Sequence, residues 1–328
     1  MVRFVSSDLP QEIIDKKSIS IYNQIRWRWH WTLSAEISTR DNSSYKISQE
    51  EIFMEQAKLA LLTEKAREIR LGAVEAVYSA ASGHPGGSLS IADILSYLYF
   101  AEMNVDPKNP KKADRDRLVL SKGHTAPALY AALAARGYFD KKLLSTFRQA
   151  DSILQGHPDM KHTPGVDMTT GSLGLGFSAA NGMALSAKIT GDAYRVYTIL
   201  GDGETEEGQV WEAAMFGAHY KLDNLMAFID FNGLQIDGKV TEVMNPTPLD
   251  EKFAAFGWNV LTIDAHDFDQ IEAACRAARE CKGKPTAVIA KSIKGKGVSY
   301  MENQVGWHGK APNKEQYDAA VAELTASV

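Results

Sequence analysis

Short apolar, β-rich runs alternate with helix-like runs in the second half of the chain, and this alternation limits the possible folds more than any other feature. The runs, in chain order, are residues 194–200, 206–220, 225–230, 260–264, 269–281 and 286–290. Such alternation indicates βαβ units, which form a parallel sheet. The strand-like runs are almost continuously apolar, as expected when helices cover both faces. We therefore predict an α/β fold, a parallel sheet with helices on both faces.

The first 50 residues differ in texture from the rest. Residues 27–31 carry three of the six tryptophans, and a polar stretch follows at residues 38–48. We predict an N-terminal extension over residues 1–52, either a poorly ordered leader or an arm whose tryptophans dock on a partner chain. A long helix is expected from residue 52 until Ser82 and Gly83 break it. Residues 53–328 are then one domain.

Composition excludes several classes of protein. The chain is 45% hydrophobic and 23% charged with a net charge of −5, so it shows no basic footprint for nucleic acid or for an anionic membrane. No apolar run has the length of a membrane span or a signal peptide, which favours a cytoplasmic protein. Cys275 and Cys281 have no partner at metal-ligand spacing, and we expect both to be reduced packing residues.

The loop after the strand at residues 194–200 predicts a metal site. In open α/β sheets, ligands bind beyond the carboxyl ends of the strands. Gly201 and Gly203 let the backbone approach a ligand closely, but Asp202 between them would repel a diphosphate unless a cation lay between the two. Asn232 follows the next strand and brings an amide oxygen to the same edge. Two oxygen ligands favour a hard divalent ion such as Mg²⁺.

Four of the eight histidines lie beside glycine in loop-like contexts rather than within helices or strands: His84, His124, His157 and His308. A rigid sheet can direct several such side chains toward one point. Near pH 7, imidazoles donate, accept and relay protons around a polyhydroxylated substrate. The remaining histidines that we assign to purely structural roles are His30, His219 and His266.

Several motifs in one order resemble the N-terminal part of a transketolase. They are Ser-Gly-His-Pro-Gly-Gly-Ser at 82–88, Ser-Lys-Gly-His at 121–124, Gly-His-Pro at 156–158, Thr-Thr-Gly-Ser-Leu-Gly at 169–174, Gly-Asp-Gly-Glu-Thr-Glu-Glu-Gly at 201–208 and Gly-Trp-His-Gly at 306–309. The match runs over about residues 55–310. The resemblance implies a thiamine diphosphate-binding domain, the one that holds the cofactor's diphosphate.

The resemblance also implies roles for single residues. The metal, Mg²⁺ or else Ca²⁺ or Mn²⁺, would be held by Asp202, Asn232 and the backbone carbonyl of Leu234. Thiamine diphosphate would be bound by residues from several loops, namely His84, His124, Gly171, Ser172, Leu173, Gly201, Asp202, Gly203, Glu204, Asn232 and His308. The four glycine-flanked histidines, His157 included, would line the sugar channel.

Two interpretations stay open for a pair of acidic residues, and two for a basic segment. By the resemblance, Glu207 and Glu212 belong to a hydrogen-bonded relay between paired active sites. From the sequence alone they are solvated acidic residues at a helix N-terminus, where the helix dipole favours them. The run of residues 291–296, with three lysines, is either a basic patch near phosphate or a solvated charged segment.

Full-length transketolases resemble this chain only in their front part. The resemblance therefore implies a separate C-terminal transketolase subunit with the pyrimidine-binding and third domains, in an α2β2 heterotetramer. The expected reaction moves a two-carbon ketol unit from a ketose to an aldose. The ketose is expected to be a sugar phosphate, with an unusual sulfonated or branched sugar left open.

Other functions stay open at this level. A deoxyxylulose-phosphate synthase or the alpha chain of a 2-oxoacid dehydrogenase would use the same cofactor, although four glycine-flanked histidines favour sugar chemistry. A non-catalytic scaffold that binds the cofactor is a third reading. Activity with pyruvate and no ketol transfer would favour one of these two other enzymes that use thiamine diphosphate over a transketolase.

Overall fold

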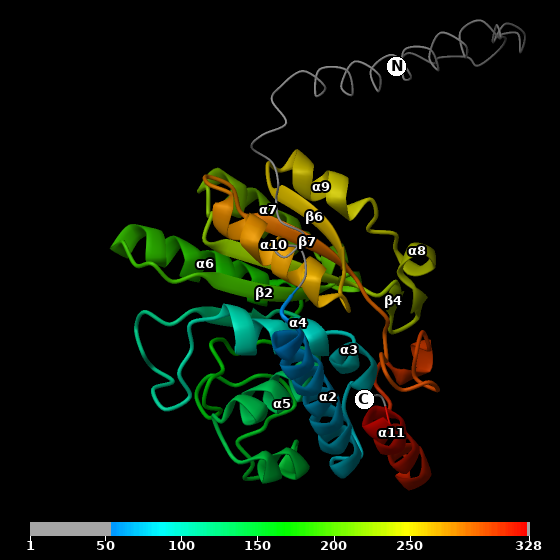
Figure 1. The fold of residues 1–328 in the computed structure, drawn as a ribbon. Helices are drawn as coiled ribbons and strands as arrows, with labels where there is room; N and C mark the ends of the chain where they lie inside the picture. The colour runs from blue at the N-terminus through cyan, green and yellow to red at the C-terminus, as the bar shows by residue number, and fades with distance from the viewer. Residues whose placement is uncertain (1–53, 327–328) are drawn as a thin grey trace, which may run out of the picture. The chain divides into compact units, whose positions relative to one another are not determined.

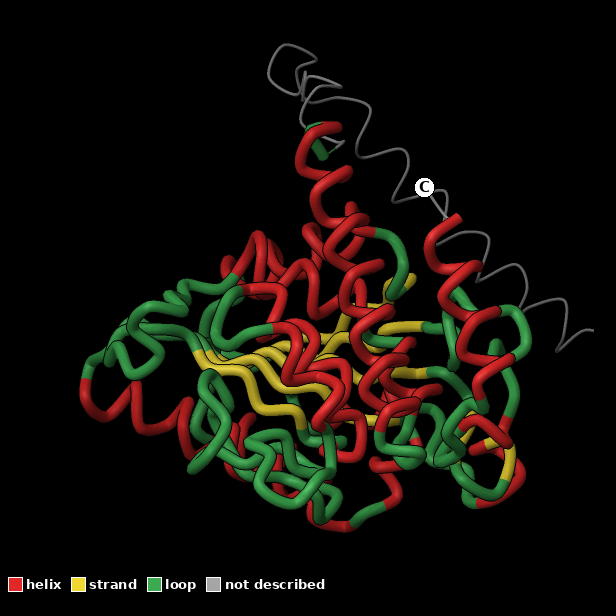
Figure 2. Tube along the Cα trace, turned by 90° about the horizontal axis from the view of Figure 1, so that it is seen from below, coloured by secondary structure: helices red, strands yellow, loops and turns green. Residues whose placement is uncertain are grey.

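The computed structural model describes residues 54–326, so the predicted extension at residues 1–52 lies outside the described residues. Five parallel strands form the main sheet in the order β1-β2-β3-β7-β6. Their bounds are Arg117–Leu120 (β1), Val196–Gly201 (β2), Leu225–Phe231 (β3), Asn259–Asp264 (β6) and Thr286–Lys291 (β7). In Figure 2 the strands lie in the interior, surrounded by helices and loops. The predicted parallel sheet is confirmed, and β1 is a strand that the sequence did not indicate.

Helices cover both faces of the sheet, as predicted. Met226 and Phe228 of β3 belong to one apolar cluster, whereas Ala227 and Ile229 between and after them belong to another. The first cluster includes side chains of α2 (Gln56–Ser79), α4 (Ala92–Tyr97), α5 (Ala126–Arg136) and α10 (Phe268–Glu280). The second includes side chains of α6 (Leu175–Thr190), α7 (Gly208–His219) and α9 (Leu249–Ala255). Successive side chains of a strand point to opposite faces, which explains the two cores.

The helix α10 shows how local sequence sets these elements. The Asp267 side chain accepts from the backbone N–H groups of Asp269 and Gln270 and caps the first turn. The buried residues of α10 recur at helical spacing and include Ile271 and Cys275. Of the two cysteines, Cys275 is buried in the apolar core, as expected of a packing residue, and Cys281 is half-buried.

A third apolar cluster supports the segment after β7. The helix α11 (Lys314–Ala326) lies beside α2 in Figure 1, and Leu324 of α11 joins Val74 of α2 in this cluster. Val298, Met301 and Trp307 of the intervening segment pack into the same cluster. This packing holds the stretch from residue 292 to 309 over the end of the sheet, where the site described below lies.

Short elements complete the described residues: α3 (Pro85–Leu89), α8 (Val240–Val243), the hairpin of β4 (Leu234–Gln235) and β5 (Gly238–Lys239), and several short 3-10 or π turns. Within residues 54–326, no helix combines the length and the apolar character that crossing a bilayer requires.

Candidate cofactor and substrate site

The carboxyl ends of β2 and β3 bring Asp202 to the loop that carries Asn232. The two strands are parallel neighbours in which Gly201 pairs with Asp230. Asp202 Oδ1 accepts from the Gly203 N–H at 2.8 Å, and Oδ2 accepts from the Gly233 N–H at 2.5 Å. The predicted convergence of the two strand ends is thus observed, because parallel neighbours end at the same sheet edge.

The Asn232 amide has a defined orientation at this edge. Its Nδ2 donates to Asp230 Oδ2 at 2.9 Å, and its Oδ1 accepts from the Leu234 N–H at 3.1 Å. The Leu234 carbonyl accepts from Lys294 Nζ at 3.0 Å. The oxygens of Asn232 and Leu234 therefore belong to the same short loop whose backbone contacts the Asp202 carboxylate.

Asp202 is a buried acid that bonds no cationic side chain of the described residues. It is 2% exposed, and burial raises its pKa to about 7, with the nearby Asp230 adding to the shift. The two backbone N–H groups offset only part of this. Lys294, also 2% exposed, has a pKa lowered by burial to about 8. A divalent ion at Asp202 would restore the ionised carboxylate at neutral pH.

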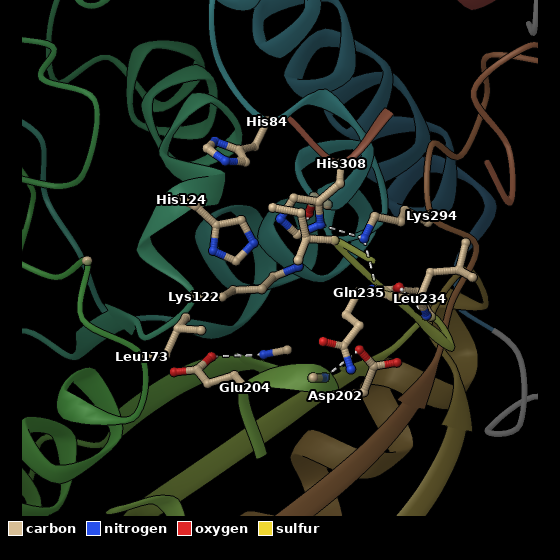
Figure 3. A pocket seen from close by; sticks show the side chains of 16 residues that line it. His84, Lys122, His124, Leu173, Asp202, Glu204, Leu234, Gln235, Lys294 and His308 are labelled. Carbon is tan, nitrogen blue, oxygen red and sulfur yellow. Dashed lines mark hydrogen bonds between the residues drawn. The ribbon is translucent and has the colours of Figure 1, made fainter. Parts of the chain in front are cut away.

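Three of the four predicted histidines meet in one cavity of about 320 Å³ that Asp202 also lines (Figure 3). The ring centres of His84, His124 and His308 lie 5.1, 5.4 and 5.3 Å apart in pairs. Burial lowers the pKa of His84 to about 4 and that of His308 to about 3. Burial lowers the pKa of His124 as well. All three rings are therefore neutral at pH 7, each with one donor and one acceptor nitrogen.

His157 lines a neighbouring cavity of about 550 Å³ instead. Its ring lies against Gly171, where an added Cβ would come within 3.3 Å of the imidazole. Gly171 itself lines the first cavity, so His157 lies directly behind a residue of that cavity. The structure groups three of the four predicted histidines in one cavity, and the place of His157 in the sugar channel stays a prediction.

The predicted cofactor residues divide into two sets. Four of them line the first cavity, namely Gly171, Leu173, Gly201 and Gly203. Ser172 is exposed and does not line this cavity. Glu204 also lines the cavity, but its carboxylate accepts from Ser121 Oγ and from the N–H groups of Gly174 and Gly201 at 2.5 to 3.0 Å. These bonds join three loops, so Glu204 braces the cavity floor.

Glu207 and Glu212 lie on the surface of the described part of the chain. Both are exposed, Glu207 just before α7 and Glu212 within it, and neither lines either cavity. Met215 and Tyr220 are exposed on or just after the same helix. A relay between paired active sites needs a second chain, so that role stays a prediction.

Two lysines line the cavity: Lys122, which was not identified from the sequence, and Lys294, which belongs to the basic run whose role was left open. Lys122 lies in the Ser-Lys-Gly-His motif, and its Nζ donates to Asp230 Oδ2 at 2.5 Å and to the Gly87 carbonyl at 2.9 Å. Lys294 bonds His308 Nδ1 at 2.9 Å as well as the Leu234 carbonyl. Lys291 at the start of that basic run is exposed. The run thus contains one buried cavity lysine, the exposed Lys291 and the half-buried Lys296.

His266 is structural, as expected. Its Nδ1 lies 2.7 Å from Asp93 Oδ2, and its Nε2 accepts from the Ile293 N–H at 3.0 Å. Arg70 grips the same carboxylate with both terminal nitrogens. This cluster fixes the backbone next to Lys294.

No cluster of three or more histidine, cysteine or acidic side chains suited to a metal occurs in residues 54–326. The donors at the β2–β3 edge are instead one carboxylate, one amide oxygen and one backbone carbonyl. All are hard oxygen donors, and Mg²⁺ bound with phosphate commonly takes only one or two protein carboxylates. The donor set therefore fits a phosphate-bridged divalent ion.

Comparison with known proteins identifies the family. The domain described as transketolase, thiamine diphosphate binding domain, matches residues 62–325. A 6-deoxy-6-sulfo-D-fructose transketolase subunit of Clostridium sp. (strain MSTE9) is 49% identical over 80% of this chain and 96% of its own length. An apulose-4-phosphate transketolase subunit of Phocaeicola vulgatus is 44% identical over 84% of this chain and 96% of its own length.

A solved structure agrees with these relatives. The transketolase of Campylobacter jejuni superposes with a TM-score of 0.77 at 35% identity, over 81% of this chain but only 43% of that longer chain. This chain thus spans less than half of that enzyme and nearly all of the two subunits above. The chain belongs to the transketolase family and is similar to the separate N-terminal subunits that carry its thiamine diphosphate-binding domain.

Proposed function

We propose that this chain is the cofactor-diphosphate half of a two-subunit transketolase that moves a two-carbon ketol unit from a ketose to an aldose. The observation that carries the proposal is the cavity in which the Asp202 edge of the sheet meets His84, His124 and His308. A metal-phosphate site beside neutral imidazoles suits a diphosphate cofactor and a polyhydroxylated substrate. Residues 53–328 form the cofactor-binding domain in this proposal, and residues 1–52 an extension.

The metal would be held by Asp202, by the side-chain oxygen of Asn232 and by the Leu234 carbonyl. Mg²⁺ suits these oxygen donors, and Ca²⁺ or Mn²⁺ suits them as well. Lys294 now bonds the Leu234 carbonyl, so its ammonium group would move to the diphosphate when the metal occupies that oxygen. Gly201 and Gly203 leave the backbone open to the phosphates.

Thiamine diphosphate supplies, when bound, the nucleophilic carbon that carries the two-carbon unit. The histidines of this chain handle protons and hydroxyl groups around it. His84 Nδ1 is buried without a hydrogen-bond partner among the described residues. His308 Nδ1 already bonds Lys294, which leaves its Nε2 for the substrate. Neutral rings of this kind accept a hydroxyl proton and return it to an alkoxide.

The sugar would carry an anionic distal group. The two relatives above are named for a sulfonated ketose and a phosphorylated branched sugar, and both differ from ordinary pentose phosphates. We assign recognition of that distal group to the C-terminal partner subunit. The assembly would be an α2β2 heterotetramer in the cytoplasm, with Glu207 and Glu212 near the contact between the two copies of this chain.

Reconstitution tests the proposal. The purified chain is mixed with the product of the neighbouring reading frame that resembles the remaining transketolase domains, together with Mg²⁺ and thiamine diphosphate. Two-carbon transfer from a sulfonated or phosphorylated ketose to an aldose is the expected result, with neither chain active alone. Turnover of pyruvate without ketol transfer would contradict it.

A further inference from the structure

Arg148 lies between two histidine-bearing loops that are far apart in the sequence. It follows the 3-10 helix Lys141–Thr146. Its Nη1 donates to Ser82 Oγ at 2.6 Å, two residues before His84. On its other side the guanidinium packs on Gly156, where an added Cβ would come within 3.1 Å of Nε, next to His157. One side chain therefore contacts both loops.

The backbone of Arg148 is held in an unfavourable conformation. Its φ of 61° lies in the left-handed region that side-chain-bearing residues rarely adopt. Its N–H donates to the Leu154 carbonyl at 2.9 Å, and its guanidinium carbon lies 5.3 Å from the centre of the buried Phe147 ring. Strained residues of this kind persist where the surroundings fix them, and they concentrate at functional sites.

Arg148 also keeps a buried polar atom without a partner. Its Nε has no hydrogen-bond partner among the described residues, and neither has Nδ1 of His84. Leaving a buried polar atom unpaired costs about 1–3 kcal/mol. Replacement by an apolar residue would remove this cost but not the backbone strain, because any residue with a Cβ is strained at this φ. Arg148 therefore keeps an unpaired buried nitrogen and a strained backbone, against one hydrogen bond to Ser82 and one contact with the Phe147 ring.

The charge of Arg148 acts on both rings. After burial, Arg148 is the largest cause that lowers the pKa of His84, ahead of His157 and Lys294. For His157, burial and Arg148 account for the lowered pKa. The other groups that face His84 are the rings of His124 and His308, which contact it edge-on.

We propose that Arg148 is a positioning residue that ties the loop of His84 to the loop of His157 and holds a permanent positive charge beside both rings. The proposal rests on the proposed function in one respect, since it takes these rings as groups that contact the sugar. An arginine stays charged at every pH of interest, so both imidazoles stay neutral and able to accept a hydroxyl proton.

The test is a histidine titration by NMR on the full chain labelled in its imidazole rings. Arg148→Gln removes both the charge and the tie, and Arg148→Lys keeps the charge but loses the planar fork. We expect Arg148→Gln to raise the pKa of His157 by about 0.5 or more, and that of His84 in the same direction. Arg148→Lys is expected to leave both values close to wild type. Assignment uses His84→Gln and His157→Gln.

Arg136→Gln is the matched control. Arg136 is a half-buried arginine that donates to the Tyr99 and Val105 carbonyls, remote from the histidines. Arg136→Gln should change thermal stability without changing the pKa of His84 or of His157. An unchanged pKa of His157 in a folded Arg148→Gln chain would overturn the proposal.

Ser82→Ala supplies an independent arm in case Arg148→Gln does not fold. It removes the acceptor of the Arg148 Nη1 hydrogen bond and leaves the charge in place. A tie between the loops predicts that the ring resonances of His84 and His157 both shift. A shift of His84 alone would contradict the tie. These readouts need no partner subunit, so absence of two-carbon transfer would contradict the proposed function without affecting this test.

Discussion

Two buried carboxylates at different places in the fold have opposite acidities. Asp93 lies in the cluster with Arg70 and His266, and these two partners overcome the effect of burial and lower its pKa to about 2. Asp202 is similarly buried at the end of β2, but burial raises its pKa to about 7.

The difference lies in the cationic partner that the chain gives to each carboxylate. The chain supplies Asp93 with the guanidinium of Arg70, whereas Asp202 accepts only from backbone N–H groups. A buried carboxylate without a paired cation is costly unless an external cation binds. The contrast supports the proposed divalent ion at Asp202, and substitutions at the two sites should have effects of different kinds.

The largest expected effect is that of Asp202→Ala on ligand binding. It removes the charged metal ligand while leaving the Asp93 cluster intact. We expect metal-dependent affinity for thiamine diphosphate to fall by about 100-fold or more in the reconstituted complex. Isothermal calorimetry measures it. Unchanged affinity would refute the metal assignment.

Asp230→Asn should have the next largest effect. Asp230 accepts from Lys122 Nζ, from Ser90 Oγ and from Asn232 Nδ2, so it orients one predicted metal ligand and neutralises a cavity lysine. Loss of such an outer contact typically lowers metal affinity about 10- to 100-fold. A Mn²⁺ titration followed by electron paramagnetic resonance measures this. Wild-type Mn²⁺ affinity would show that Asn232 needs no support from Asp230.

Asp93→Asn is expected to affect stability. The pKa of Asp93 is lower in the folded chain than the ordinary value of 3.8, so its contribution is present above pH 4 and is lost as the pH falls toward 2. We expect Asp93→Asn to lower the free energy of unfolding by about 2 kcal/mol at pH 7, and by less below pH 4. Urea unfolding of the metal-free chain at several pH values checks this.

Asp202→Asn is the matched control, and its effect on the free energy of unfolding should have the opposite sign to that of Asp93→Asn. The raised pKa of Asp202 makes its ionisation destabilising, so the cost is absent below about pH 4 and grows as the pH rises toward 7. In the metal-free chain at pH 8, Asp202→Asn should increase the free energy of unfolding by about 1 kcal/mol. Equal destabilisation by both substitutions would remove the contrast between the two acids.

The smallest effect is expected from Glu212→Gln. Glu212 is exposed on α7 and lines neither cavity, so in the isolated chain the free energy of unfolding should change by less than about 0.5 kcal/mol. Reduced two-carbon transfer in the assembled enzyme, with unchanged ligand binding, would support the relay. Weakened Mn²⁺ binding by the isolated chain would contradict the relay role, because it would link Glu212 to the metal site.

The sequence predicted the parts of the fold that depend on local pattern. The strands β2, β3, β6 and β7 are apolar runs between helical segments, and the positions of Asp202 and Asn232 follow from where two of these strands end. The strand β1 has four residues after an irregular segment and is held by pairing with β2 about eighty residues later. Its own sequence gives little signal.

Long-range pairs in the site were not predictable in the same way. Lys122 and Asp230 are 108 residues apart, and nothing in either local sequence indicates the other. The position of His157 depends on an irregular loop that packs against Gly171, so the glycine context alone did not separate it from the other three histidines. Tertiary packing decided both cases.

The most direct test of the account is the position of a bound metal. The reconstituted complex is crystallised with Mn²⁺ and thiamine diphosphate, and the anomalous scattering of manganese locates the ion. We expect one peak between Asp202, the Asn232 side-chain oxygen and the Leu234 carbonyl, in contact with the diphosphate. A bound cofactor with no metal at this edge of the sheet, or with the metal held by other residues, would contradict it.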